Sequence, residues 1–143
     1  MAEFAENALQ TVAVNGNFTF SDATVPYTYP YGSVMHRDGS GLVTLRGNSR
    51  SRFSIYRVTY SANVAIPADG TVEPVSTAIA VNGEALPTTT AIITPAAVSN
   101  FWHVTDTTDV FVPNGCCVQV SIKNVSSQAI EAQNSSLIVE RLA

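Results

Sequence analysis

The alternation that decides the fold lies in residues 118–123, which read VQVSIK. Apolar and polar side chains take turns in this stretch, and successive side chains of a β-strand point to opposite faces of its sheet. We therefore expect the three apolar residues to face a core and the three polar residues to face water. This pattern is typical of a half-buried antiparallel strand.

Sequence patterns typical of β-strands extend over most of the chain. From Gln10 onward, runs rich in Val, Ile, Thr, Tyr and Phe alternate with Gly, Pro, Asn and Asp, and helical periodicity is nearly absent outside a short stretch at 2–9. We expect an all-β, antiparallel β-sandwich, because no helices are present to cross between parallel strands. Strands are expected at 9–14, 17–21, 33–37, 41–46, 52–66, 71–82, 90–95, 101–105, 110–113, 116–124 and 135–142.

Turns and one irregularity divide these strands. Glycine-containing turns are expected at 38–41, 67–70, 82–83 and 114–115, where Asn, Asp or Pro accompanies the glycine. Within the long run 52–66, the apolar residues change parity near Tyr56 and Arg57. A one-residue slip turns a strand inside out, so this change predicts a bulge or a bend between the sheets.

Composition narrows the classes of function. The 143 residues fit one domain, and we divide them into an N-terminal arm at 1–8 and a sandwich domain at 9–143. Charged residues make up 13% of the chain, about half of the average of ~25%, and the net charge is −4. These values argue against disorder, nucleic-acid binding and membrane insertion. Acids near the start and the lack of an apolar run favour synthesis in the cytoplasm without a signal peptide.

Five segments of the chain form a recognisable order of motifs: LQTV at 9–12, HRDGSGLVTLRG at 36–47, AIP at 65–67, AVNGEALP at 80–87 and SLIVERL at 136–142. In this order they resemble small structural proteins of tailed bacteriophages of gut Firmicutes. The closing strands are similar to the jelly roll of the tumour necrosis factor and complement globular-head superfamily.

The resemblance implies a jelly-roll virion protein that forms a homotrimer, binds the major capsid protein or another virion protein, and acts as a capsid decoration or head-fibre protein. It supplies no catalytic residues. Low charge is compatible with a protomer that packs against other subunits. The alternative is that Ser, Thr, Asn and Gln cover an ordinary β-surface.

Aromatic residues suggest a second function, the binding of a host surface glycan or receptor. Tyr27, Tyr29 and Tyr31 surround Pro30, which makes a rigid amphipathic loop able to stack on sugars or on a partner protein. The alternative is an aromatic lid over one end of the sandwich. For Trp102 we expect core packing, with a contact role left open.

Attachment to the capsid has two candidate regions. Arg46, Arg50 and Arg52 could form a docking patch for an acidic surface, or a solvated loop that pairs with acids across strands. The arm offers Phe4 as its large apolar anchor, followed by Leu9, and could instead be a frayed terminus.

No residues with the spacing of a catalytic or metal-binding motif occur. His36 and His103 lack nearby ligands in sequence, and the adjacent Cys116 and Cys117 match neither a zinc nor a redox motif. We therefore expect no enzymatic activity, no metal and no cofactor.

Overall fold

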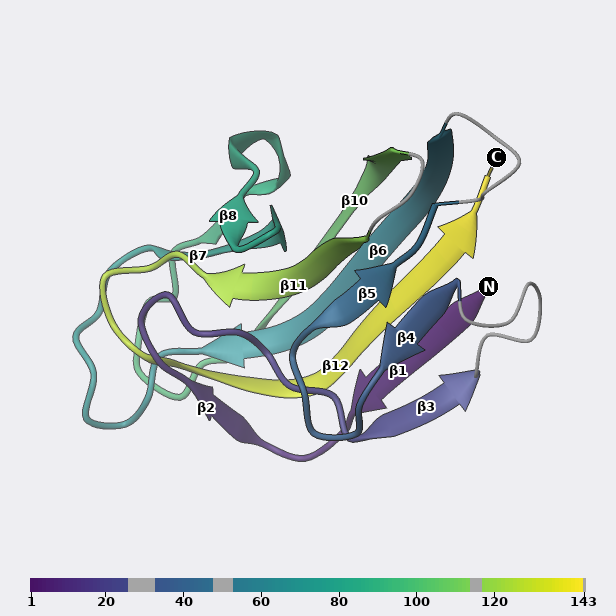
Figure 1. The fold of residues 1–143 in the computed structure, drawn as a ribbon. Helices are drawn as coiled ribbons and strands as arrows, with labels where there is room; N and C mark the ends of the chain where they lie inside the picture. The colour runs from purple at the N-terminus through teal and green to yellow at the C-terminus, as the bar shows by residue number, and fades with distance from the viewer. Residues whose placement is uncertain (26–32, 48–52, 114–116, 143) are drawn as a thin grey trace.

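The computed structural model describes residues 1–25, 33–47, 53–113 and 117–142, and it consists of two antiparallel β-sheets (Figure 1). The elements of the described residues are β1 (Ala2–Glu6), β2 (Gln10–Val12), β3 (Asp22–Val25), β4 (Val34–His36), β5 (Val43–Leu45), β6 (Phe53–Ala65), β7 (Val75–Val81), β8 (Glu84–Ala85), the 3-10 turn η1 (Pro87–Thr89), β9 (Ala91–Ile93), β10 (Trp102–Pro113), β11 (Val118–Asn124) and β12 (Ile130–Arg141). None of them is a helix long and apolar enough to span a membrane.

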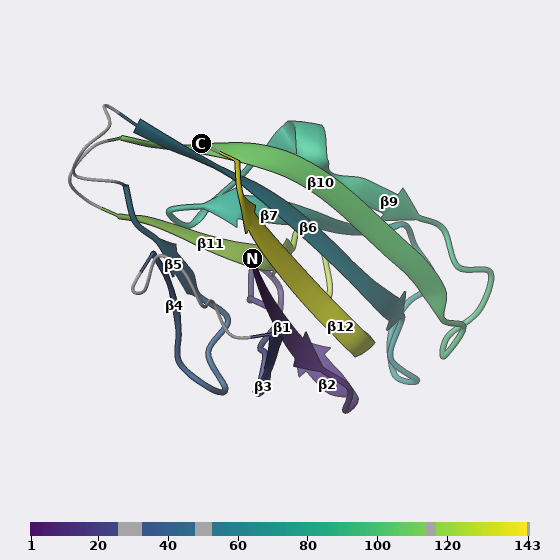
Figure 2. The ribbon, with the colours of Figure 1, turned by 90° about the vertical axis from the view of Figure 1, so that its right-hand side faces the viewer.

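The strand order is that of a jelly-roll sandwich, which confirms the predicted fold class. Sheet A has the order β10-β6-β12-β1-β3, with β2 also paired to β12. Sheet B has the order β4-β5-β11-β7-β8, with β9 also paired to β7. The turned view in Figure 2 separates the two sheets into layers, with β10, β6 and β12 in one and β4, β5 and β11 in the other.

The inner faces of both sheets supply the core. Tyr56, Val58 and Tyr60 of β6 are at most 1% exposed, and the apolar residues of the 118–123 stretch are buried as predicted. Ser121 differs from the prediction, because this polar residue is 1% exposed. It lies opposite Ala80 of β7, and short side chains at both positions allow close packing there.

The predicted bulge near Tyr56 and Arg57 is wrong. Strand β6 pairs with β10 without a register shift from Phe53 to Val64, and its buried side chains keep one parity. Phe53 and Ile55 change the apolar pattern because they lie on the outer face, where Phe53 is 40% exposed. Among the described residues, the register shifts of sheet A lie instead in the β12–β6 pair, between Gln133 and Ser136, and in the β1–β3 pair, between Glu3 and Ala5.

The N-terminal residues are not a separate arm, which corrects the predicted boundary at residue 8. Residues 2–6 form β1 and pair in register with the end of β12, from Ala2 opposite Val139 to Glu6 opposite Ser135. Alternation explains this: Ala2 and Phe4 turn inward, at 0% and 4% exposed, and Glu3 turns outward. The helical periodicity at 2–9 therefore does not produce a helix.

Two strand boundaries also differ from expectation. The separate strands predicted at 101–105 and 110–113 are one strand, β10, whose polar middle is tolerated because β10 is an edge strand of sheet A. The strand predicted at 17–21 is reduced to a single bridge from Asn17 to Lys123. Phe18 and Phe20 of that segment are nevertheless buried.

The turn predictions are confirmed where the structure describes them. Gly39 has φ +84° in the turn between β4 and β5, and Asn82 and Gly83 have φ of 52° and 83° between β7 and β8. Positive φ at both central residues is typical of a type I′ hairpin. Gly70 closes the turn at 67–70 by donating to the Pro67 carbonyl oxygen at 2.8 Å. The turn predicted at 114–115 lies outside the described residues.

One buried amide fastens three chain segments. The side chain of Asn124 donates to the carbonyl oxygens of Val12, Ala13 and Gln128 at 3.1, 3.3 and 2.9 Å, and its oxygen accepts from the Ser126 N–H at 2.9 Å. Asn124 is 0% exposed, so water cannot replace these hydrogen bonds.

We expect Asn124→Ala to lower the free energy of unfolding by about 2–4 kcal/mol, because several buried polar groups would lose their partners. Urea denaturation measures this value. Asn100→Ala, at an exposed asparagine, is the matched control and should stay within about 0.5 kcal/mol of the original protein. An equally small effect at Asn124 would contradict the role of this amide.

A second buried polar contact crosses the core between the sheets. The hydroxyl of Tyr60 in β6 lies 2.7 Å from the hydroxyl of Thr77 in β7. Burial raises the pKa of Tyr60 to about 12, although the hydrogen bond with Thr77 acts in the opposite direction. The folded protein therefore favours the neutral phenol.

This shift predicts a loss of stability in alkali. An unfolded tyrosine loses its proton near pH ~10, so the free energy of unfolding should fall as pH rises from there towards the folded pKa of about 12. Tyr60→Phe should remove this component and cost about 1 kcal/mol at neutral pH. Thermal unfolding of both proteins at a series of pH values tests this; parallel profiles would contradict it.

Candidate functional site

The outer face of sheet A is a broad surface of mostly short polar side chains, here named the polar face. The residues cross four neighbouring strands, because Thr107, Thr59, Ile138 and Glu3 are successive partners in one row of the sheet. The next row joins Thr105, Ser61, Ser136 and Ala5. The polar face comprises Glu3, Ala5, Thr59, Ser61, Asn63, His103, Thr105, Thr107, Ser136 and Ile138.

Lateral hydrogen bonds tie these side chains to the sheet. The Thr59 and Thr107 hydroxyls lie 3.0 Å apart, and Nδ1 of His103 lies 3.1 Å from the amide oxygen of Asn63. Thr105 donates its hydroxyl to the Tyr60 carbonyl oxygen at 2.9 Å. These side chains are partly ordered before any partner arrives, which lowers the entropy that binding costs.

One ion pair borders the polar face. Arg57 donates through Nε and an Nη to the two carboxylate oxygens of Asp109, at 2.9 and 3.2 Å. These hydrogen bonds lower the pKa of Asp109 and raise the pKa of Arg57. Both side chains are about half exposed, so solvent screens the pair and it contributes little to folding.

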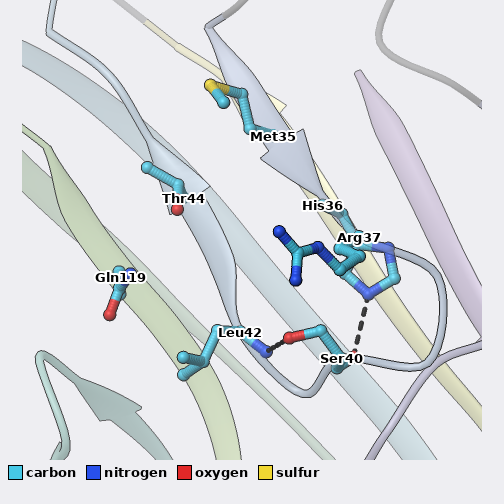
Figure 3. Close-up of a pocket in the computed structure, with 7 residues that line it drawn as sticks. All are labelled: Met35, His36, Arg37, Ser40, Leu42, Thr44 and Gln119. Carbon is cyan, nitrogen blue, oxygen red and sulfur yellow. Dashed lines mark hydrogen bonds between the residues drawn. The ribbon is translucent and has the colours of Figure 1, made fainter.

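A shallow hollow of about 440 Å³ lies on the outer face of sheet B (Figure 3). Its floor is one cross-strand row, in which Met35 of β4 pairs with Thr44 of β5, and Thr44 pairs with Gln119 of β11. The turn between β4 and β5 forms its rim with His36, Arg37, Ser40 and Leu42. This volume falls in the range of small-molecule sites.

The predicted aromatic site is only partly described. Tyr27, Tyr29 and Tyr31 lie outside the described residues, so their contact role stays a prediction. Trp102 is 47% exposed, which corrects the expected core packing. It forms the end pair of the β10–β6 ladder, opposite Val64, where the edge of the sandwich leaves part of the indole uncovered. Phe101 beside it is 40% exposed.

The predicted docking arginines do not all fall within the described part. Arg46 is exposed just after β5, whereas Arg50 and Arg52 lie outside the described residues. Arg57, which follows them in the sequence, pairs with Asp109 across strands. A docking role for Arg46, Arg50 and Arg52 stays a prediction.

The two residues predicted to attach the chain to the capsid differ in solvent exposure. Phe4 is 4% exposed, and its ring centroid lies 4.5 Å from that of His36 in the opposite sheet, so the folded domain does not offer it to a partner. Leu9 is 54% exposed in the connection between β1 and β2.

The histidines lie in different surroundings. Nε2 of His36 lies 2.9 Å from the Ser40 carbonyl oxygen, and because that oxygen only accepts, Nε2 carries the proton. His103 belongs to the polar face of the other sheet. Among the residues that the structure describes, no three His, Cys, Asp or Glu side chains gather where they could hold a metal ion.

Sequence reasoning missed the polar face, the hollow and an exposed aromatic pair. Phe53 and Phe111 stack with ring centroids 5.2 Å apart and are 40% and 59% exposed. Each feature joins residues of different strands and depends on pairing register, which a single sequence does not give. The sequence held one signal for the aromatic pair: the change of apolar parity after Phe53 and Ile55 indicates that Phe53 lies on the outer face of its sheet.

A comparison with solved structures supports the fold assignment. No family model and no curated protein matches this sequence. Among solved structures, the globular domain of zebrafish complement 1qA protein is similar, with a TM-score of 0.50 and 8% identity over 96% of this chain and 94% of that chain.

Two further structures are more distant. The sugar-binding C-terminal domain of EclA has a TM-score of 0.35 and 10% identity over 82% of this chain and 90% of that chain. A GH26-CBM35 β-(1,4)-mannanase of Podospora anserina has a TM-score of 0.35 and 14% identity over 96% of this chain and 29% of that chain. What the complement 1qA domain shares with this chain is the fold, a jelly-roll sandwich.

Proposed function

We propose that the chain is a non-enzymatic structural protein of a tailed-bacteriophage virion, a homotrimer that decorates the capsid or forms a head fibre. The phage origin and the number three come from the resemblance of segments such as 36–47 and 136–142. The observation that carries the association of subunits is the polar face, which spans four strands of sheet A.

Its chemistry suits contact with another copy of the chain. Interface cores are depleted in charged residues, and the two central rows of the polar face carry a single acid, Glu3. The short Thr, Ser and Ala side chains allow two sheets to approach closely. Ordered hydroxyl and amide groups offer hydrogen bonds along the contact.

The outer face of sheet B suits a different use. It is interrupted by the hollow and carries the exposed arginine Arg37 at the rim. Trimers built through sheet A would leave this face pointing away from the threefold axis. For capsid contact, the exposed Leu9 is a better candidate than the buried Phe4, and the proposed partner is the major capsid protein.

A second candidate function is a carbohydrate- or receptor-binding head of a phage fibre or tail component. The exposed indole of Trp102 favours it, because aromatic faces stack on sugar rings and the neighbouring Phe101 enlarges the apolar area. This role would not require a catalytic group.

The subunit association is tested by mass. The 15.2 kDa chain should run as a species of about 45 kDa in multi-angle light scattering. Thr59→Arg, which places a charge in the middle of the polar face, should shift it towards the monomer mass. Thr94→Arg, at an exposed threonine outside sheet A, is the matched control. A monomeric original protein, or an intact Thr59→Arg trimer, would contradict the proposed interface.

The location of the chain separates the two candidate functions. Antibodies against the chain, applied to particles of the phage that encodes it and viewed by electron microscopy, should label the head if it is a decoration or head-fibre protein. Labelling confined to the tail tip would favour the receptor-binding head. Particles without label would contradict both.

A further inference from the structure

The rim of the hollow on sheet B is held in one shape by backbone contacts. Ser40 donates its N–H to the Arg37 carbonyl oxygen at 2.9 Å, and its hydroxyl oxygen accepts from the Leu42 N–H at 3.0 Å. Gly39 N–H donates to the Phe20 carbonyl oxygen at 2.8 Å, which anchors the turn to a neighbouring segment. A ligand would therefore meet a preorganised rim.

Gly41 fixes this arrangement further. A Cβ atom at this position would lie 2.5 Å from the Phe18 carbonyl oxygen, a distance too short for any side chain. The turn consequently rests directly on the backbone beside Phe18. The ring of His36, whose Nε2 donates to the Ser40 carbonyl oxygen, supports the turn from the inner side.

Arg37 brings a positive charge to this rim. Figure 3 shows its guanidinium group extending from the turn over the hollow, on the side of Thr44. Among the described residues, no carboxylate lies within ion-pair distance of the Arg37 guanidinium group. The guanidinium group of Arg57, in contrast, is paired with Asp109. A guanidinium group binds a carboxylate through two parallel hydrogen bonds. The chain has a net charge of −4, so Arg37 gives this rim a positive charge on a protein that is negative as a whole.

The remaining lining mixes two kinds of contact. Met35 and Leu42 are 45% and 37% exposed and give apolar surface at two sides of the hollow. Thr44 and Gln119 add a hydroxyl and an amide, which donate to and accept from hydroxyl groups. A sugar ring has this same combination of apolar C–H faces and hydroxyl groups around its edge.

We propose that the hollow binds an acidic saccharide, with the carboxylate of a uronic-acid ring held by Arg37. Thr44, Gln119 and the Ser40 hydroxyl bind ring hydroxyls, and Met35 and Leu42 pack against the ring. All these groups belong to one protomer, so the proposal does not depend on the trimer. It also uses a different surface from Trp102, which lies on β10 of the other sheet.

Isothermal titration calorimetry tests the proposal with four probes: trigalacturonate, the neutral trisaccharide maltotriose, acetate and the peptide triglutamate. Trigalacturonate should bind with a Kd of about 1 mM or below. Each of the other three should bind about tenfold more weakly or worse, because each lacks either the carboxylate or the ring hydroxyls. Equal binding of maltotriose, acetate or triglutamate would overturn the proposal, as would no binding of trigalacturonate.

Variants locate the site. Arg37→Ala should weaken trigalacturonate binding about tenfold or more, and Arg37→Lys should restore part of it, since lysine keeps the charge without the fork. Arg57→Ala, at an arginine of the other sheet that pairs with Asp109, is the matched control and should bind as the original protein does. Amide NMR shifts should change at Thr44 and Gln119. Unchanged binding by Arg37→Ala would overturn the assignment.

Thr59→Arg separates this result from the proposed trimer. It should bind trigalacturonate normally whatever its mass, because the polar face and the hollow lie on different sheets.

Discussion

The structure depends on the double pairing of its last strand. β12 forms hydrogen bonds with β6 along one edge and with β1 and β2 along the other, so it occupies the middle of sheet A. Sheet A therefore cannot be completed until β12 has paired with β6 and with β1, which lies far from it in the sequence. Pairings between such distant segments cost loop-closure entropy before they contribute stability, and they are typical of slowly folding β-proteins.

The sequence predicts the parts of this fold that rest on local pattern. The alternation at 118–123 and the turns around Gly39 and Gly83 are determined by side-chain parity and by positive φ, both of which are local properties. The boundaries fail where tertiary context prevails. Phe53 is apolar yet lies outside, and Ala2–Glu6 is too short and polar to suggest a strand until β12 is known to need a partner.

The candidate sites were harder to predict for the same reason. The polar face and the hollow each combine residues of three or more strands, and the row of Met35, Thr44 and Gln119 exists only because of two separate registers. Side-chain chemistry alone indicated some residue types suited to binding, such as the arginines and the tryptophan. It did not indicate which of them share a surface.

The two sheets offer surfaces of different character. The outer side of sheet A has short, laterally bonded side chains over four strands, which favours broad contact with a matching surface. The outer side of sheet B has a hollow with a charge at its rim, which favours a small ligand. A jelly roll accommodates both because its core lies between the two sheets, so that much of each outer face is free to diverge.

The glycine at position 41 has a consequence for how such a domain can diversify. Its contact with the backbone at Phe18 forbids a side chain, so the course of the turn between β4 and β5 stays constant while neighbouring positions vary. Changes at 37, 40 and 42 would alter the charge, size and polarity of the rim without moving its frame. We would then expect natural variants of this domain to differ in the side chains at 37, 40 and 42 while the backbone of the turn keeps the same course.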